Sequence, residues 1–151
     1  MLNNLRKLFL FVLFLYAGSL SLIGQEVTYE GEKDGVIMLS VFESNVNKKD
    51  AVSVAIKDAY FHILFRGIPG STQNRNALLG TDEYAPQKRQ YYDDLINGER
   101  LYSFITYSNL DYYKRREGIS KKVAVIKLSV NVKALISDLE RKNLYRRFGL
   151  Y

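Results

Sequence analysis

The stretch KKVAVIKLSVNVKALISDLER, residues 121–141, changes its hydrophobic period halfway and predicts a strand that leads directly into a helix. In its first half, Ala124, Ile126 and Leu128 alternate with Val123, Val125 and polar residues, as in a half-buried strand. In its second half, the apolar residues recur every three or four positions, which predicts a helix over residues 131–149. Asn131 is a natural cap for its start.

The segment VTYEGEKDGVIMLSVFESN, residues 27–45, predicts a β-hairpin, because Asp34-Gly35 is a strong turn signal between β-prone runs. Both faces of its second strand are largely apolar, which favours a central position in the sheet. A helix is then predicted up to Gly67, with one apolar stripe from Val52 to Leu64. Asn47 or Asp50 would cap its start, and Gly67 would end it in a left-handed conformation.

The stretch FRGIPGSTQNRNALLG, residues 65–80, is interpreted as a turn at Pro69-Gly70 followed by a solvated loop. The alternative is a phosphate-binding loop, but such loops place their glycines before a helix, where free N–H groups face the anion. Here the glycines come after the helix. A binding role is still predicted for four polar residues of this loop: Gln73, Asn74, Arg75 and Asn76.

The remaining elements complete an α+β order. A short helix is predicted over residues 85–98 with Pro86 in its first turn, followed by strands over residues 99–109 and 121–132 with a long connection between them. The order ββα(α)ββα predicts a single small domain over residues 25–151. We expect an antiparallel or mixed sheet of about four strands, with two main helices packed on one side.

Residues 1–24 have the composition of a signal peptide. Arg6 and Lys7 precede ten uncharged, mostly apolar residues and then small residues, and cleavage is expected after Gly24 or Ser21. The alternative is an uncleaved anchor, because residues 8–25 carry no charge. We therefore expect an exported protein, in the periplasm or associated with the envelope of a Gram-negative bacterium.

The cysteine and histidine content of the chain excludes several classes of protein and of metal site. The chain has no cysteine, which excludes a disulfide framework and a lipobox. It has 22 Lys and Arg against 16 Asp and Glu, and loss of the leader leaves a net charge of +4. With a single histidine, a zinc site of His and Cys ligands cannot be built within one chain. No metal and no cofactor is expected.

A basic and aromatic segment is the strongest candidate for binding. It surrounds the predicted connection between the last two strands and contains Tyr112, Tyr113, Lys114, Arg115, Arg116, Lys121 and Lys122. Interleaved aromatic and basic residues are typical of surfaces for single-stranded nucleic acid, but export argues against that partner. An envelope protein is expected instead, or an anionic lipid or glycan. The alternative interpretation is an ordinary soluble hairpin tip.

The order of elements, with a helix ending at Gly67, a hairpin and then NVKALISDLERKNL, resembles modules of exported bacterial assembly proteins. The similarity is to the LPP20-like and flagellar FlgT N-terminal families and the wider curli-secretion CsgG-like group, over residues 36–148. It implies a noncatalytic role in assembly or scaffolding. Many members are lipoproteins, and this chain lacks the cysteine that lipid attachment requires.

The chain is thus predicted to be a noncatalytic interaction or assembly module. The alternative is a small envelope hydrolase or polysaccharide-binding protein that acts on an anionic polymer. In that case, His62, Asp93 and Asp94 would be the candidate acids and bases, and at least two of them would have to meet in one pocket. An interaction module would leave them dispersed.

Overall fold

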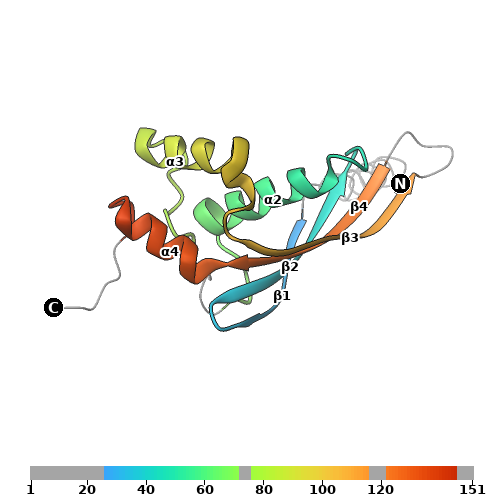
Figure 1. Cartoon of the computed structure of the whole chain (residues 1–151), viewed down its shortest axis with the longest axis horizontal. Coiled ribbons are helices and arrows are strands. Elements are labelled where there is room, and N and C mark those ends of the chain that lie inside the picture. The colour runs from blue at the N-terminus through green and yellow to red at the C-terminus, as the bar shows by residue number, and fades with distance from the viewer. Residues whose placement is uncertain (1–25, 72–75, 116–121, 146–151) are drawn as a thin grey trace, which may run out of the picture.

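The computed structural model describes residues 26–71, 76–115 and 122–145. The predicted leader, the loop residues Gln73, Asn74 and Arg75, and the hairpin residues Arg116 and Lys121 lie outside these ranges. The described residues form a small α+β domain, as predicted, with the strands and helices in the order ββα(α)ββα (Figure 1). The structure adds two short helical segments, one after the first helix and one before the third strand.

The sheet has four strands and is antiparallel throughout. In chain order the strands are β1 (Glu26–Lys33), β2 (Val36–Ser44), β3 (Ile105–Arg115) and β4 (Lys122–Asn131), and their spatial order is β1-β2-β4-β3. The predicted central position of β2 is confirmed. The predicted Asp-Gly turn is also confirmed, because Asp34 and Gly35 have φ values of 54° and 84°, the positive pair that a tight hairpin turn requires.

Helix α2 (Ala51–Phe61) packs along one face of this sheet (Figure 1). Its apolar stripe, including Ala55, Ile56 and Ala59, is fully buried against the inward residues of β2 and β4. Ile37, Leu39 and Val41 alternate inward on β2, and Ala124, Ile126, Leu128 and Val130 alternate inward on β4. The core therefore lies between α2 and the inner face of the sheet.

The end of this helical region differs in detail from the prediction. After α2 the chain forms a wider π-helical turn, η1 (His62–Arg66), and the Gly67 N–H bonds to the His62 carbonyl, five residues back. Gly67 has φ 79° but an extended ψ of 164°, so the predicted left-handed conformation is wrong. That combination of angles is open almost only to glycine. Asp50 stands at the N-cap position but makes no capping side-chain bond.

Helix α3 (Pro86–Ile96) begins at Pro86 as predicted, but the strand predicted from residue 99 does not begin there. Residues Gly98–Tyr102 form a 3-10 turn, η2. This turn buries Leu101 and offers its carbonyl to the Tyr60 hydroxyl at 3.0 Å. The tertiary contact with α2 thus overrides the local strand preference. β3 starts at Ile105 and continues to Arg115, so much of the predicted connection is strand.

Helix α4 (Val132–Arg141) follows β4 without a break and extends beyond the end of the sheet (Figure 1). Asn131 is its N-cap as predicted, because its side-chain oxygen accepts the Ala134 N–H at 2.9 Å. The helix ends before the predicted boundary. In the described parts of the chain, no helix has the length and apolar character needed to cross a membrane.

Candidate interaction face

The face of the sheet opposite α2 has no helix over it in the described part of the chain (Figure 1). We call it the open face. Strand alternation and register assign side chains to it from all four strands. They are Glu26, Thr28, Glu30 and Lys33 of β1, Val36, Met38, Ser40, Phe42 and Ser44 of β2, Val123, Val125, Lys127 and Ser129 of β4, and Tyr107, Asn109, Tyr112 and Lys114 of β3.

The strand register arranges the open face in rows. One row is apolar over three strands, with Phe42, Val125 and Tyr112 directly opposite one another. A polar row, which contains Lys127, separates it from a third row that carries Met38 and Tyr107. The open face is therefore amphipathic, with one continuous apolar row and a second row in which Ser129 lies between Met38 and Tyr107.

Three of the most exposed large apolar residues of the described chain lie on this face. Met38 is 40% exposed, Tyr107 is 53% exposed and Tyr112 is 48% exposed. Exposed apolar side chains gathered on one face make that face a candidate interaction surface. Tyrosine suits this use because its ring packs against apolar groups while its hydroxyl stays hydrated.

A β-bulge places the two tyrosines on the same face. Tyr107 and Tyr112 are five residues apart, so in a regular strand they would point to opposite sides of the sheet. Two β3 residues, Asp111 and Tyr112, stand where β4 supplies only Val125. Because of this extra residue, Tyr112 lies on the open face. Bulges commonly change the direction of a side chain in this way.

The charges of the open face are unevenly distributed. Near its middle, Lys127 of β4 forms an ion pair with Glu30 of β1, so its charge is locally balanced. At the hairpin end, Lys114 is exposed opposite Val123, and the sequence continues there with Arg115 and Arg116. The charges at the middle of the face are therefore locally balanced, and Lys114 is an exposed cation at its hairpin end.

The structure separates the predicted hairpin residues into two groups. Tyr112 and Lys114 lie on the open face. Tyr113 lies on the inner face, where it packs against the core and its hydroxyl donates to the Val46 carbonyl at 3.4 Å. Lys122 is half-buried and its Nζ donates to the Asn47 side-chain oxygen at 2.7 Å. Tyr113 and Lys122 thus connect the loop end of the β3–β4 hairpin to the segment between β2 and α2.

Among the predicted loop residues, only Asn76 is described, and it is exposed in the connection between η1 and α3. This connection is not part of the sheet. The structure therefore does not place Asn76 on the open face.

The structure gives different contacts to each of the acids and bases of the alternative enzyme. The His62 ring lies edge-on to Phe61, with centroids 6.4 Å apart. Burial lowers the pKa of His62, and the charges that act on it come from Asp58 and Arg66. Asp93 forms an i,i+4 ion pair with Arg89 at 3.1 Å, and Asp94 is exposed.

The described residues contain another pair of acids that the sequence interpretation missed. Glu43 of β2 is only 2% exposed and hydrogen-bonds to Asp58 of α2. Burial, and then the bond and the charge of Asp58, raise the pKa of Glu43 to about 8. Oε1 of Glu43 and Oδ2 of Asp58 are buried and have no hydrogen-bond partner among the described residues. Extending the alternation of Ile37, Leu39 and Val41 by one step would have predicted an inward Glu43.

This pair does not form a metal site, because the described ranges contain no group of three or more His, Cys, Asp or Glu side chains that could hold an ion.

Comparison of the chain with protein-family models, with curated proteins and with solved structures finds no match. The residues that the structure describes thus define an α+β domain in which helix α2 covers one face of the sheet and no described helix covers the other.

Proposed function

We propose that this chain is a noncatalytic interaction module of the bacterial envelope, which binds a partner protein through its open face and the basic end of the β3–β4 hairpin. The proposal combines the predicted export with the surface that the fold leaves uncovered. It agrees with the assembly role implied by the resemblance to the LPP20-like and FlgT N-terminal families.

The observation that carries the proposal is the alignment of Tyr107 and Tyr112 on one face. The Asp111 bulge brings them to the side of the sheet that also carries Met38 and Phe42. A sheet face that contacts only water does not require two tyrosines to lie on the same side. An apolar row across three strands that contains aromatic residues is, in contrast, typical of the buried centre of a protein interface.

The same features indicate the chemistry of the partner. The aliphatic side chains Val36, Val123 and Val125 accompany the tyrosines, and they favour an apolar protein surface over a hydrated glycan. The unbalanced basic end favours acidic residues at one edge of that surface. We therefore expect a partner whose contact area has an apolar centre and an acidic rim.

Affinity capture from envelope fractions with paired variants tests this function. The Tyr107→Ser, Tyr112→Ser double variant should lose at least tenfold of the captured partner, because aromatic anchors at an interface contribute about 2 kcal/mol or more each. The variant in which Lys114, Arg115 and Arg116 are replaced by Ala should retain part of the binding and lose its dependence on salt.

The matched control is the Tyr84→Ser, Tyr102→Ser double variant. These tyrosines are 80% and 53% exposed and lie outside the sheet, so their loss removes at least as much exposed aromatic surface elsewhere. This control should capture the partner as the unchanged chain does. Equal capture by all three variants, each shown to be folded by its urea midpoint, would refute the proposed function.

A further inference from the structure

A cavity of about 660 Å³ lies beside α4, away from the centre of the open face. One wall is the helix itself, with Lys133, Ser137 and Arg141 spaced at four-residue intervals along one side. The other wall is η2 with the residues that follow it, which contribute Arg100 and Phe104. We call this cavity the α4 groove.

The α4 groove has more positive than negative charge. Its lining contains Arg100, Lys133 and Arg141 but only one acid, Asp138, which is 5% exposed. The Asp138 carboxylate accepts bonds from the Arg100 guanidinium at 2.8 Å, from the Tyr91 hydroxyl at 2.8 Å and from Arg141. One carboxylate thus holds two guanidinium groups, and Lys133 adds a third cation, so the lining carries two excess positive charges.

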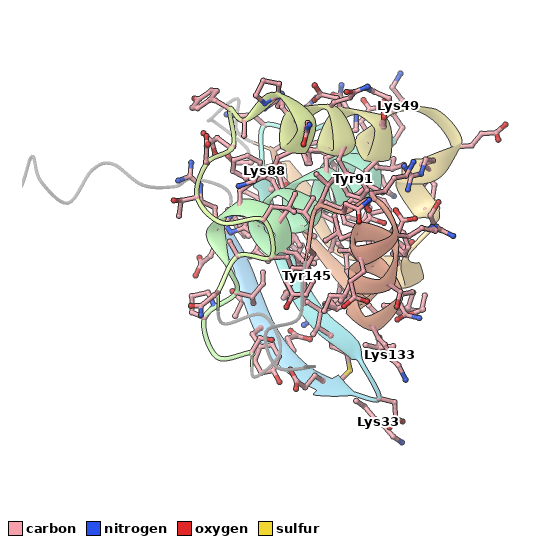
Figure 2. All side chains as sticks on the ribbon, turned by 90° about the vertical axis from the view of Figure 1, so that its left-hand side faces the viewer. Lys33, Lys49, Lys88, Tyr91, Lys133 and Tyr145 are labelled. Carbon is pink, nitrogen blue, oxygen red and sulfur yellow. The ribbon has the colours of Figure 1, made fainter. Side chains whose placement is uncertain are left out.

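The arginines are held in position, but their charge is still accessible. The side chain of Arg100 is 37% exposed, and its guanidinium lies 5.6 Å from the Tyr91 ring. Figure 2 shows Tyr91 between α3 and α4, where it supports this cluster. The Arg141 side chain is 76% exposed. Burial alone would raise the pKa of Asp138, but the bonds from Arg141, Tyr91 and Arg100 lower it, so this carboxylate stays ionised and keeps the cluster together.

The backbone at the start of α4 offers little to a ligand. The Ala134 N–H bonds to the Asn131 side chain, and the Lys133 N–H bonds to the Gly35 carbonyl at 3.1 Å. Recognition in the α4 groove would therefore come from side chains. Between the cations, Phe104 and Ala134 provide apolar surface.

The dimensions of the helix set the spacing of the cations. Lys133 and Arg141 are eight residues apart, which in an α-helix corresponds to about 12 Å. An extended peptide covers the same length in about four residues, at roughly 3.3 Å per residue. Two carboxylates four residues apart, with an apolar side chain between them, match the charge and the surface of this groove.

We propose that the α4 groove binds an extended acidic peptide segment of a partner, with one carboxylate at Lys133, a second at Arg141, and an intervening apolar side chain on Phe104. Arg100 adds a third cation opposite the helix. This site is separate from the open face, so it does not depend on the function proposed above.

A peptide titration followed by NMR tests the proposal with the whole mature chain. The probe is acetyl-Glu-Ala-Leu-Ala-Glu-amide, and its neutral counterpart has Gln in place of both Glu. The acidic peptide should shift the amide signals of Ser103, Ser137 and Arg141, and the neutral peptide should leave them unchanged. Each exposed ion pair contributes about 0.2–1 kcal/mol, so loss of the Lys133 pair alone should weaken binding roughly 1.4- to fivefold, and the repulsion that Lys133→Glu adds should increase this effect.

The matched control is Lys49→Glu, which makes the same change of charge at an exposed lysine. Figure 2 places Lys49 far from Lys133, at the other side of the molecule. Lys49→Glu should bind the acidic peptide as the unchanged chain does, and so should Tyr112→Ser on the open face. Arg141→Gln provides a second groove variant that removes a charge without adding one.

Three results would overturn the proposal: equal shifts with the neutral peptide, equal weakening by Lys49→Glu, or binding of inorganic phosphate to the same residues as tightly as the peptide. The last result would make the α4 groove a site for small anions and not for a peptide.

Discussion

The two faces of the sheet share the same strands but are used in different ways. On the covered face, each inward residue of β4 from Ala124 to Val130 is at most 1% exposed, because α2 lies over it. On the open face, Val123, Val125 and their neighbours are only half-buried, although several are equally apolar. Apolar composition alone therefore does not tell which face becomes the core. The difference is set by helix α2, which covers one face, while no helix of the described residues covers the other.

The largest expected difference between the faces is in stability. Leu39 and Met38 are neighbours in β2 that point to the covered and the open face, with 0% and 40% exposure. Leu39→Ala should lower the free energy of unfolding by about 2–5 kcal/mol, since it leaves a cavity in the core. Met38→Ala should cost less than about 1 kcal/mol. Urea denaturation measures both, and equal losses would contradict the assignment of the faces.

The next difference is in pH dependence. Glu43 is the buried acid of the covered face, and its pKa of about 8 lies above that of an unfolded glutamate. The folded state therefore holds this proton between pH ~4.5 and 8 while the unfolded state has lost it, so stability falls as the pH rises through this window. At ~1.4 kcal/mol per pKa unit, the loss is on the order of a few kcal/mol.

Glu43→Gln should remove this fall and make the protein more stable than the unchanged chain at pH 8. Glu30→Gln on the sheet's opposite side removes one acid too, and should leave the fall intact. Unfolding curves recorded from pH 5 to 8 compare the variants. A fall of the same size in Glu43→Gln would mean that another group causes it.

The smallest expected effect is that of the Lys127–Glu30 ion pair on the open face. Their side chains are 34% and 37% exposed, so water screens the pair. Lys127→Ala should change the free energy of unfolding by less than about 1 kcal/mol. A loss of several kcal/mol in urea denaturation would show that the open face is covered after all.

Those parts of the fold that depend on neighbouring residues were predictable from the sequence. The alternation in β4, the Asp34-Gly35 turn and the Asn131 cap each have a local physical cause, and each is confirmed. The η2 turn was not predictable in this way, because it depends on the bond between Tyr60 and the Leu101 carbonyl, 41 positions away in the chain.

The candidate site was only partly predictable. The basic and aromatic composition drew attention to Tyr112 and Lys114, which do lie on the open face. Tyr107 was missed and Tyr113 was included, because the side on which a β3 residue lies depends on the bulge at Asp111. A bulge is a property of the pairing between two strands, and one strand's sequence does not reveal it.

The central claim is that the open face contacts a partner in the cell, and site-specific photo-crosslinking tests it most directly. A benzophenone amino acid would replace Tyr107 or Tyr112 on the open face, or Tyr84 or Tyr102 outside the sheet. We predict one discrete crosslinked product from positions 107 and 112 and none from positions 84 and 102. The same product from all four positions, or no product from 107 and 112, would contradict the account.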